Sequence, residues 1–164
     1  MNMIDVMRSG HQTVMKAVDG LEPERWEEPN YVVGVWTTKH IVAHLASFEA
    51  VLIDVLTAID DGDANTPVLD EILAGPAQFN DAHVAMREHL APDEVLRQYE
   101  SNFEEAVELA RALPADVRTR NGLLEWYGSD YDLEDLIAYM FYGHKREHSA
   151  QIKLFRKTLE RGHS

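Results

Sequence analysis

Two histidines four residues apart, His144 and His148, lie within an apolar helical pattern in the C-terminal part of the sequence. At about 100° per residue, both fall near the centre of an apolar stripe formed by Leu133, Leu136, Ile137, Met140, Phe141, Ile152, Phe155 and Leu159. An imidazole at a core-facing position costs free energy unless its nitrogens are hydrogen-bonded or bound to a metal. The pair therefore indicates either a hydrogen-bonded core cluster or a metal site.

A third histidine, His44, has the same kind of position on another helical pattern, among Ile41, Leu45, Phe48, Val51, Leu52 and Val55. Neutral imidazole is a common ligand for zinc and also suits nickel, copper and iron. Residues four apart on a helix bring two ring nitrogens close to one point. A third nitrogen from a second helix leaves a coordination position open for water or substrate. We therefore predict a three-histidine metal site, with histidines packed in the core as the alternative.

The other candidate residues are weaker. His40 lies about 85° from the centre of its apolar stripe, against about 45° for His44, so we expect it at the edge of the stripe or near the helix start. His11 lies within the apolar stripe of the first helix, where a hydrogen-bonded core histidine is a better interpretation than a fourth ligand or a hydrogen-bond partner of a ligand. Glu147 is rotated away from the histidines and is a poor candidate base. A solvated helix face is the interpretation of Glu100, Glu104, Glu105 and Glu108.

Four amphipathic helices must position these side chains. Their expected bounds are Met3 to Asp19, a cap at Thr37 or Thr38 to Ile59, Pro92 to just before Pro114, and a cap at Asp132 to Leu159. Residues 21–36 read as a loop, 66–90 as one or two shorter helices, and the β-leaning run 31–33 is too short for a strand. We expect an all-α four-helix bundle in a single domain, residues 1–164, with a long connection between the second and third helices that can cross the bundle.

Composition narrows the possible partners and compartments. The net charge is −14, with 29 acidic residues against 15 Lys and Arg. The negative electrostatic field of such a chain repels phosphate backbones and anionic lipids. No apolar run approaches about 18 residues, and the N-terminus lacks a signal-peptide pattern. We therefore expect no nucleic-acid or membrane partner and a cytoplasmic location. The absence of cysteine excludes disulfides, thiolate ligands and a cysteine nucleophile.

Two segments resemble the DinB-like superfamily. Residues 35–45, VWTTKHIVAHL, contain its tryptophan, Ser/Thr cap, lysine and helix-start histidine, and residues 142–152, YGHKREHSAQI, contain its His-x-x-x-His followed by a small residue and Gln-Ile. Residues 79–81, FND, followed by 92–96, PDEVL, are similar to a narrower subgroup. This subgroup lies near the mycothiol-dependent maleylpyruvate isomerase N-terminal domain and the colibactin self-resistance proteins. The absence of a second domain argues against the two-domain isomerase itself.

The resemblance implies a bundle that holds nickel, zinc or a similar divalent ion on His44, His144 and His148, and often a homodimer. Characterised relatives include transferases for low-molecular-weight thiols, such as bacillithiol and mycothiol, and detoxifying hydrolases. We therefore expect a metal-dependent thiol transferase or hydrolase that acts on a small electrophile, with the thiol as cosubstrate. A stress protein that sequesters a metal or a small molecule without turnover is the alternative. The expected pocket residues are His11, Tyr99, Trp126 and Tyr142.

Overall fold

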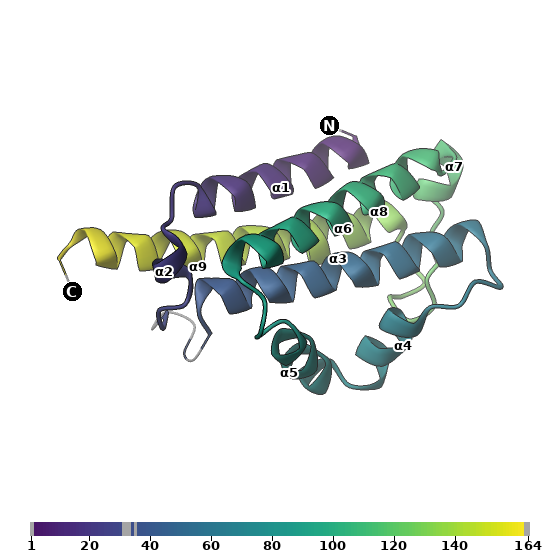
Figure 1. Ribbon diagram of the computed structural model, residues 1–164. Coiled ribbons are helices and arrows are strands. Elements are labelled where there is room, and N and C mark those ends of the chain that lie inside the picture. Colours follow the sequence, from purple (N-terminus) through teal and green to yellow (C-terminus); the bar gives the residue numbers. More distant parts are fainter. Residues whose placement is uncertain (1, 31–33, 35, 163–164) are drawn as a thin grey trace.

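The computed structural model of the chain describes residues 2–30, 34 and 36–162 (Figure 1). Over these residues the chain is helical, with an isolated β-bridge between Pro29 and Thr37. The β-leaning run 31–33 lies outside the described residues. The elements are α1 (Met3–Val18), α2 (Pro23–Trp26), α3 (Thr38–Asp60), α4 (Pro67–Ala74), α5 (Pro76–Met86), α6 (Pro92–Ala112), α7 (Ala115–Arg118), α8 (Leu133–Leu136), the π-helix η1 (Ile137–Tyr142) and α9 (Gly143–Glu160).

Four long helical segments form the bundle: α1, α3, α6 and the continuous run from α8 through η1 to α9 (Figure 1). Helix α3 packs along α6, where the Asn102 side chain donates to the Ala46 carbonyl at 3.1 Å. Helix α1 packs along α9, where Arg156 donates to the Ala17 carbonyl at 2.9 Å. Both pairs are parallel, because α4 and α5 carry the chain back along the bundle before α6 begins (Figure 1). The predicted all-α bundle and its crossing connection are confirmed.

Side-chain caps fix the starts of α3 and α8, as expected from the sequence. The Thr37 hydroxyl accepts from the His40 N–H at 3.1 Å, and His40 Nδ1 accepts from the Thr37 N–H at 3.1 Å. At the start of α8, the Asp132 carboxylate accepts from the Asp135 N–H at 2.8 Å, and the Asp135 carboxylate accepts from the Asp132 N–H at 2.9 Å. Each pair satisfies two backbone donors that the first helical turn leaves free. These caps fix where the histidine-bearing helices begin.

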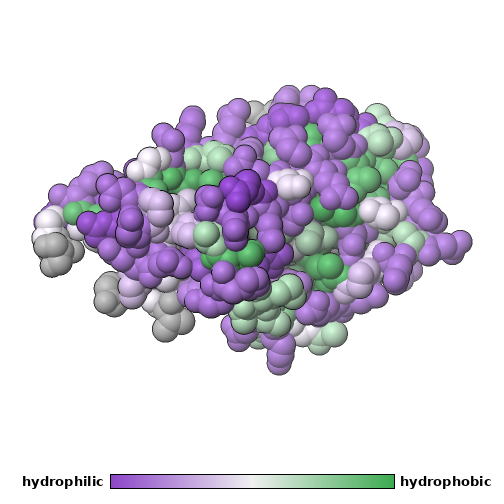
Figure 2. Space-filling model, viewed as in Figure 1, coloured by the Kyte–Doolittle hydropathy of each residue, from purple (hydrophilic) through white to green (hydrophobic). Residues whose placement is uncertain are grey.

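Helix α3 is the central element of the core. It is covered by α6, α4, α5 and α9, with α2 at its start. Its length of 23 residues and mean hydropathy of 1.7 over 18 residues match a membrane span in length and composition, so the expectation that no apolar segment reaches this length was wrong. However, 67% of that window is buried inside the bundle, as in the core helix of a globular protein. Figure 2 shows hydrophilic side chains over most of the visible face, with hydrophobic surface in separate patches.

The fourth long helix differs from the uniform α-helix that its periodicity predicts. Between α8 and α9, residues 137–142 form a π-helix, and the Gly143 N–H donates to the Ala138 carbonyl, five residues earlier. A π-turn holds an additional residue and rotates the helix that follows; such turns are frequent near functional sites. Here the π-helix ends immediately before the turn that carries His144.

Candidate metal centre

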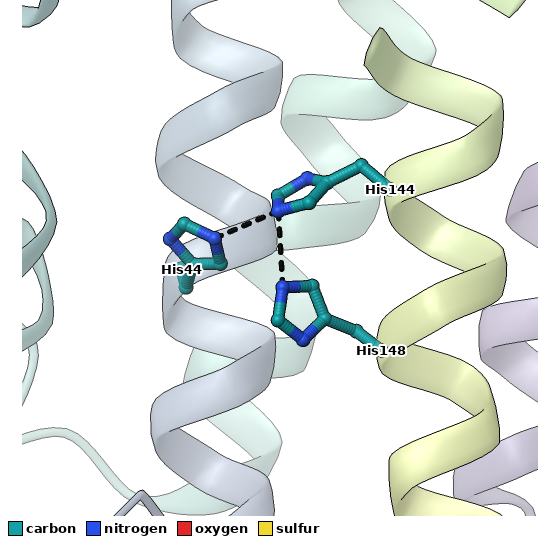
Figure 3. Close-up of side chains that lie close together, drawn as sticks. All are labelled: His44, His144 and His148. Atoms are coloured by element: carbon teal, nitrogen blue, oxygen red, sulfur yellow. Dashed lines mark hydrogen bonds between the residues drawn. The ribbon is translucent and has the colours of Figure 1, made fainter. Parts of the chain in front are cut away.

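The three predicted histidines lie together between α3 and α9, with their imidazoles pointing toward one another (Figure 3). His144 Nε2 lies 2.9 Å from His44 Nε2 and 3.0 Å from His148 Nε2. One nitrogen from each ring lies within 4.8 Å of the others. His44 is buried, whereas His144 and His148 are half-buried, so the two imidazoles from α9 are more exposed than the one from α3.

Aromatic rings hold the buried side of this histidine cluster in place. The Trp36 ring lies 4.9 Å from the His44 ring, between centroids. The Phe48 ring, one turn further along α3, lies 4.8 Å from His44 and 4.4 Å from His144. Bulky apolar neighbours restrict the rotamers of the imidazoles and keep water from their buried faces. The imidazoles of His44 and His144 are therefore held in place by packing.

Burial keeps the three rings uncharged. Burial, followed by the two neighbouring imidazoles, lowers the pKa of His44 to about 2. Burial, His148 and Lys145 lower the pKa of His144 to about 3. Burial also lowers the pKa of His148, against the opposing effect of a hydrogen bond to Gln151. At neutral pH each ring therefore has a lone pair on one nitrogen, which is the form that binds a metal ion.

Hydrogen bonds alone leave this cluster unsatisfied. The amide oxygen of Gln151 lies 2.7 Å from His148 Nδ1; because that oxygen can only accept, Nδ1 carries the proton and Nε2 of the neutral ring is bare. His144 Nε2 offers either one proton or one lone pair, so it cannot donate to His148 and also accept from His44. His44 Nδ1 is buried without a hydrogen-bond partner among the residues described, and a cation on Nε2 would leave it so. A divalent cation would take up the lone pairs of all three Nε2 atoms, so the donor set fits a metal.

Gln151 is a residue whose role the sequence analysis missed. It lies three residues after His148 and accepts from the ring nitrogen that faces away from the cluster. Histidines that bind metals usually donate their second N–H to an oxygen, which fixes the tautomer and the ring orientation. The available signal was the i, i+3 spacing between His148 and Gln151, which places both side chains on one helix face.

His40 and the neighbouring lysine have an anchoring role and lie outside the histidine cluster. Besides its capping bond, His40 Nε2 lies 2.7 Å from Glu88 Oε2. Lys39 is buried and donates to Glu27 Oε1 at 2.9 Å and to the Glu88 carbonyl at 2.8 Å. These bonds attach the first turn of α3 to the segments before it and after α5. They hold the start of the helix that presents His44.

Two of the expected pocket residues, His11 and Tyr99, lie elsewhere, in the interior between α1 and α6. His11 Nδ1 is 3.1 Å from the Tyr99 hydroxyl, and the His11 ring stacks on Phe103 at 4.0 Å. Burial, with smaller effects from nearby charges, raises the pKa of Tyr99 well above its usual value and lowers that of His11 to about 4. The phenol therefore donates to a neutral imidazole. His11 is a half-buried histidine that packs and hydrogen-bonds within the bundle.

The other two expected pocket residues also lie outside the histidine cluster. Tyr142 packs beside Gly10 of α1, and the Arg146 guanidinium lies 5.7 Å from its ring centroid. Trp126 lies in the segment between α7 and α8, is 37% exposed and lines a neighbouring cavity. Sequence periodicity does not predict such placements, because they depend on how the helices are rotated relative to one another.

A helical bundle with three histidines facing one another from two helices has the architecture of the DinB-like superfamily. The comparisons with known proteins support this class. The sequence profile of the mycothiol maleylpyruvate isomerase N-terminal domain matches residues 7–133. The chain belongs to this family.

The fold agrees with a solved structure related to this family. The chain is similar to the crystal structure of a histidine-to-alanine mutant of the mycothiol-dependent maleylpyruvate isomerase, with a TM-score of 0.73 and 15% sequence identity. The similarity covers 92% of this chain and 59% of that chain, so this chain spans little more than half the length of the isomerase. No curated protein matches the chain. The family match includes His44 but ends before His144 and His148, so the complete cluster rests on the geometry described above.

Proposed function

We propose that the chain is a metal-dependent enzyme that transfers a low-molecular-weight thiol to small electrophiles or hydrolyses them. The observation that carries this proposal is the convergence of three neutral imidazoles whose Nε2 atoms cannot all be satisfied by hydrogen bonds to one another. His44, His144 and His148 would hold the metal, for which zinc and nickel both suit imidazole ligands. Three protein ligands would leave a position for an exchangeable ligand.

A divalent cation at this site would lower the pKa of a bound thiol or water and so supply a nucleophile at neutral pH. The protein's own contribution is orientation and exclusion of water. Gln151 fixes the tautomer of His148, and the rings of Trp36 and Phe48 cover the buried side of the imidazoles. The partial exposure of His144 and His148 would give the reactants access to the metal.

The thiol in this proposal comes from a cosubstrate. The chain contains no cysteine, so it has no thiol of its own to activate. The family name refers to mycothiol, which makes a low-molecular-weight thiol the first class to test. Such thiols are kept reduced in the cytoplasm, which we retain as the proposed compartment.

Metal analysis of protein purified without a histidine tag tests the site. We expect close to one equivalent of zinc or nickel per chain, and loss of most of it in His148→Ala. Glu147→Ala is the matched control, since Glu147 is the adjacent exposed residue on α9 and the proposal gives it no role. An unchanged metal content in His148→Ala would contradict the site.

Turnover tests the reaction. With mycothiol or bacillithiol and a panel of electrophiles, the metal-loaded protein should give a rate above that of the chelator-treated protein and of His148→Ala. The apolar walls of the cluster suit a non-catalytic binder as well. Stoichiometric loss of the electrophile or metal without turnover would therefore favour sequestration over catalysis.

A further inference from the structure

A cavity of about 340 Å³ lies beside the histidine cluster, in the groove between α3 and η1. Two of its lining residues, Phe48 and Val51, lie one and two turns along α3 from His44. Two others, Met140 and Phe141, lie just before the start of α9. Helix α4 and the segment around Trp126 form the other walls. Phe48 lines the cavity and also packs against the rings of His44 and His144, so the cavity lies next to the cluster.

Phe48 is a shared wall between the cluster and the cavity. Its ring centroid lies 4.4 Å from that of His144 and 6.3 Å from that of Phe141, which also lines the cavity. A molecule in the cavity would thus be separated from the imidazoles by a single aromatic side chain. A substrate whose ring occupies the cavity would have to pass its reactive end around the Phe48 ring to reach the histidines.

The walls of the cavity are held in place from outside. The Asp54 carboxylate of α3 accepts from the backbone N–H groups of Val68 and Leu69 at 2.8 and 3.0 Å, which caps the start of α4 and fixes it against α3. At the rim, Leu73 is 49% exposed and Trp126 is 37% exposed. Large apolar side chains held at the mouth of a cavity favour an apolar occupant, because burial removes their surface from water.

The residues that line the cavity disfavour a charged ligand. No charged side chain is among the described residues that line the cavity, and the lining residues with a hydrogen-bonding side chain are Trp126 and Tyr127. The chain as a whole has a net charge of −14, so an anion would meet repulsion without a cationic partner. An apolar cavity of about 150 Å³ accepts benzene, so one of 340 Å³ has room for a substituted aromatic ring.

We infer that this cavity binds the uncharged, aromatic part of the electrophile on which the histidine cluster acts. The inference rests on the proposed function for its reaction, but the binding itself depends on the cavity walls. The selectivity is for neutral apolar rings over anionic ones. Leu73 and Trp126 are the residues at the rim that a ligand would cover.

Two related fluorescent dyes test the inference directly. N-phenyl-1-naphthylamine is neutral, and 8-anilino-1-naphthalenesulfonate is the same ring system with an anionic sulfonate. We expect saturable binding of one neutral dye per chain and affinity at least tenfold weaker for the sulfonated dye. Leu73→Asp should weaken binding of the neutral dye at least tenfold. Leu154→Asp on α9 is the matched control, because Leu154 is 48% exposed and does not line this cavity.

Trp126→Ala gives a second variant in case Leu73→Asp fails to fold, and it should also weaken binding of the neutral dye. The titrations are made on both chelator-treated and zinc-loaded protein. Dye binding that persists without metal, even if no metal site exists, would support the cavity and leave only the reaction in doubt. Absence of saturable binding, equal affinity for the two dyes, or unchanged binding in a folded rim variant would overturn the inference.

Discussion

At the scale of single residues, metal binding depends on which nitrogen of each imidazole is unprotonated. His148 is the best-defined of the three, because Gln151 accepts from its Nδ1 and leaves Nε2 directed at His144. The sequence shows that these side chains share a helix face, whereas the tautomer follows from the 2.7 Å contact. Gln151 is therefore a positioning residue for the proposed metal.

Removing the acceptor at Gln151 should weaken the metal site without abolishing the fold. We expect Gln151→Leu to bind zinc about 10- to 100-fold more weakly, the usual effect of losing such a partner. Gln151→Glu keeps an oxygen acceptor and should retain affinity. Competition with a chromophoric chelator measures both. Equal affinity in Gln151→Leu and the wild type would show that the hydrogen bond does not orient His148.

At the scale of elements, a buried ion pair ties α3 to α9 beside the histidines. Lys145 forms this pair with Glu49, and both side chains are almost fully buried. The Lys145 ammonium also lies 4.8 Å from the centroid of the Phe103 ring. Since Lys145 follows His144 and Glu49 lies five residues after His44 on α3, this pair and the histidine cluster join the same two helices.

Breaking this pair on one side should destabilise the bundle strongly. We expect Glu49→Leu to lower the free energy of unfolding by about 3–5 kcal/mol, because it leaves a buried ammonium without its partner. The double change Glu49→Leu/Lys145→Met should recover much of this loss. Urea unfolding measures both variants. The control is Arg97→Ala, which removes an ion pair whose two side chains are more than 60% exposed. This control should lower the free energy of unfolding by less than about 1 kcal/mol. A double variant no more stable than Glu49→Leu would contradict this account.

At the scale of the whole molecule, acid should unfold the metal-free protein through its neutral histidines. His11, His44, His144 and His148 all have lowered pKa values when folded, chiefly from burial. Above about pH 6.5 both folded and unfolded states are neutral at these sites. As the pH falls below that value, the unfolded chain takes up protons first, so stability is lost until the folded pKa values are reached.

We therefore expect the free energy of unfolding of the chelator-treated protein to be lower at pH 5 than at pH 7.5. Linkage limits the loss to about 1.4 kcal/mol per pH unit for each proton taken up, and the half-buried rings should contribute less. His11→Phe removes one such proton and should give a shallower decline. Urea unfolding at several pH values measures the slope. A stability that does not change between pH 7.5 and pH 5 would contradict the buried neutral state of these residues.

Local features determined much of the architecture. Caps such as Thr37 and Asp132, proline at Pro92 and the apolar periodicity predicted the long helices because these effects act within one or two turns of chain. The same periodicity placed His44, His144 and His148 on apolar faces. The family resemblance is confirmed by the profile match to residues 7–133. The metal ligation and the homodimer remain predictions.

The tertiary structure decided what depends on the relative rotation and pairing of helices. The π-turn at residues 137–142 has no periodicity signal, and the separate long helix that packs against it is α1. The parallel pairing of α3 with α6 arises from the crossing of α4 and α5, and it buries Tyr99 against His11 away from the histidine cluster. Likewise, Phe48 separates the cluster from an apolar cavity only because α3, α4 and η1 meet there. Sequence spacing determines the face on which a side chain lies, and long-range packing determines what that face meets.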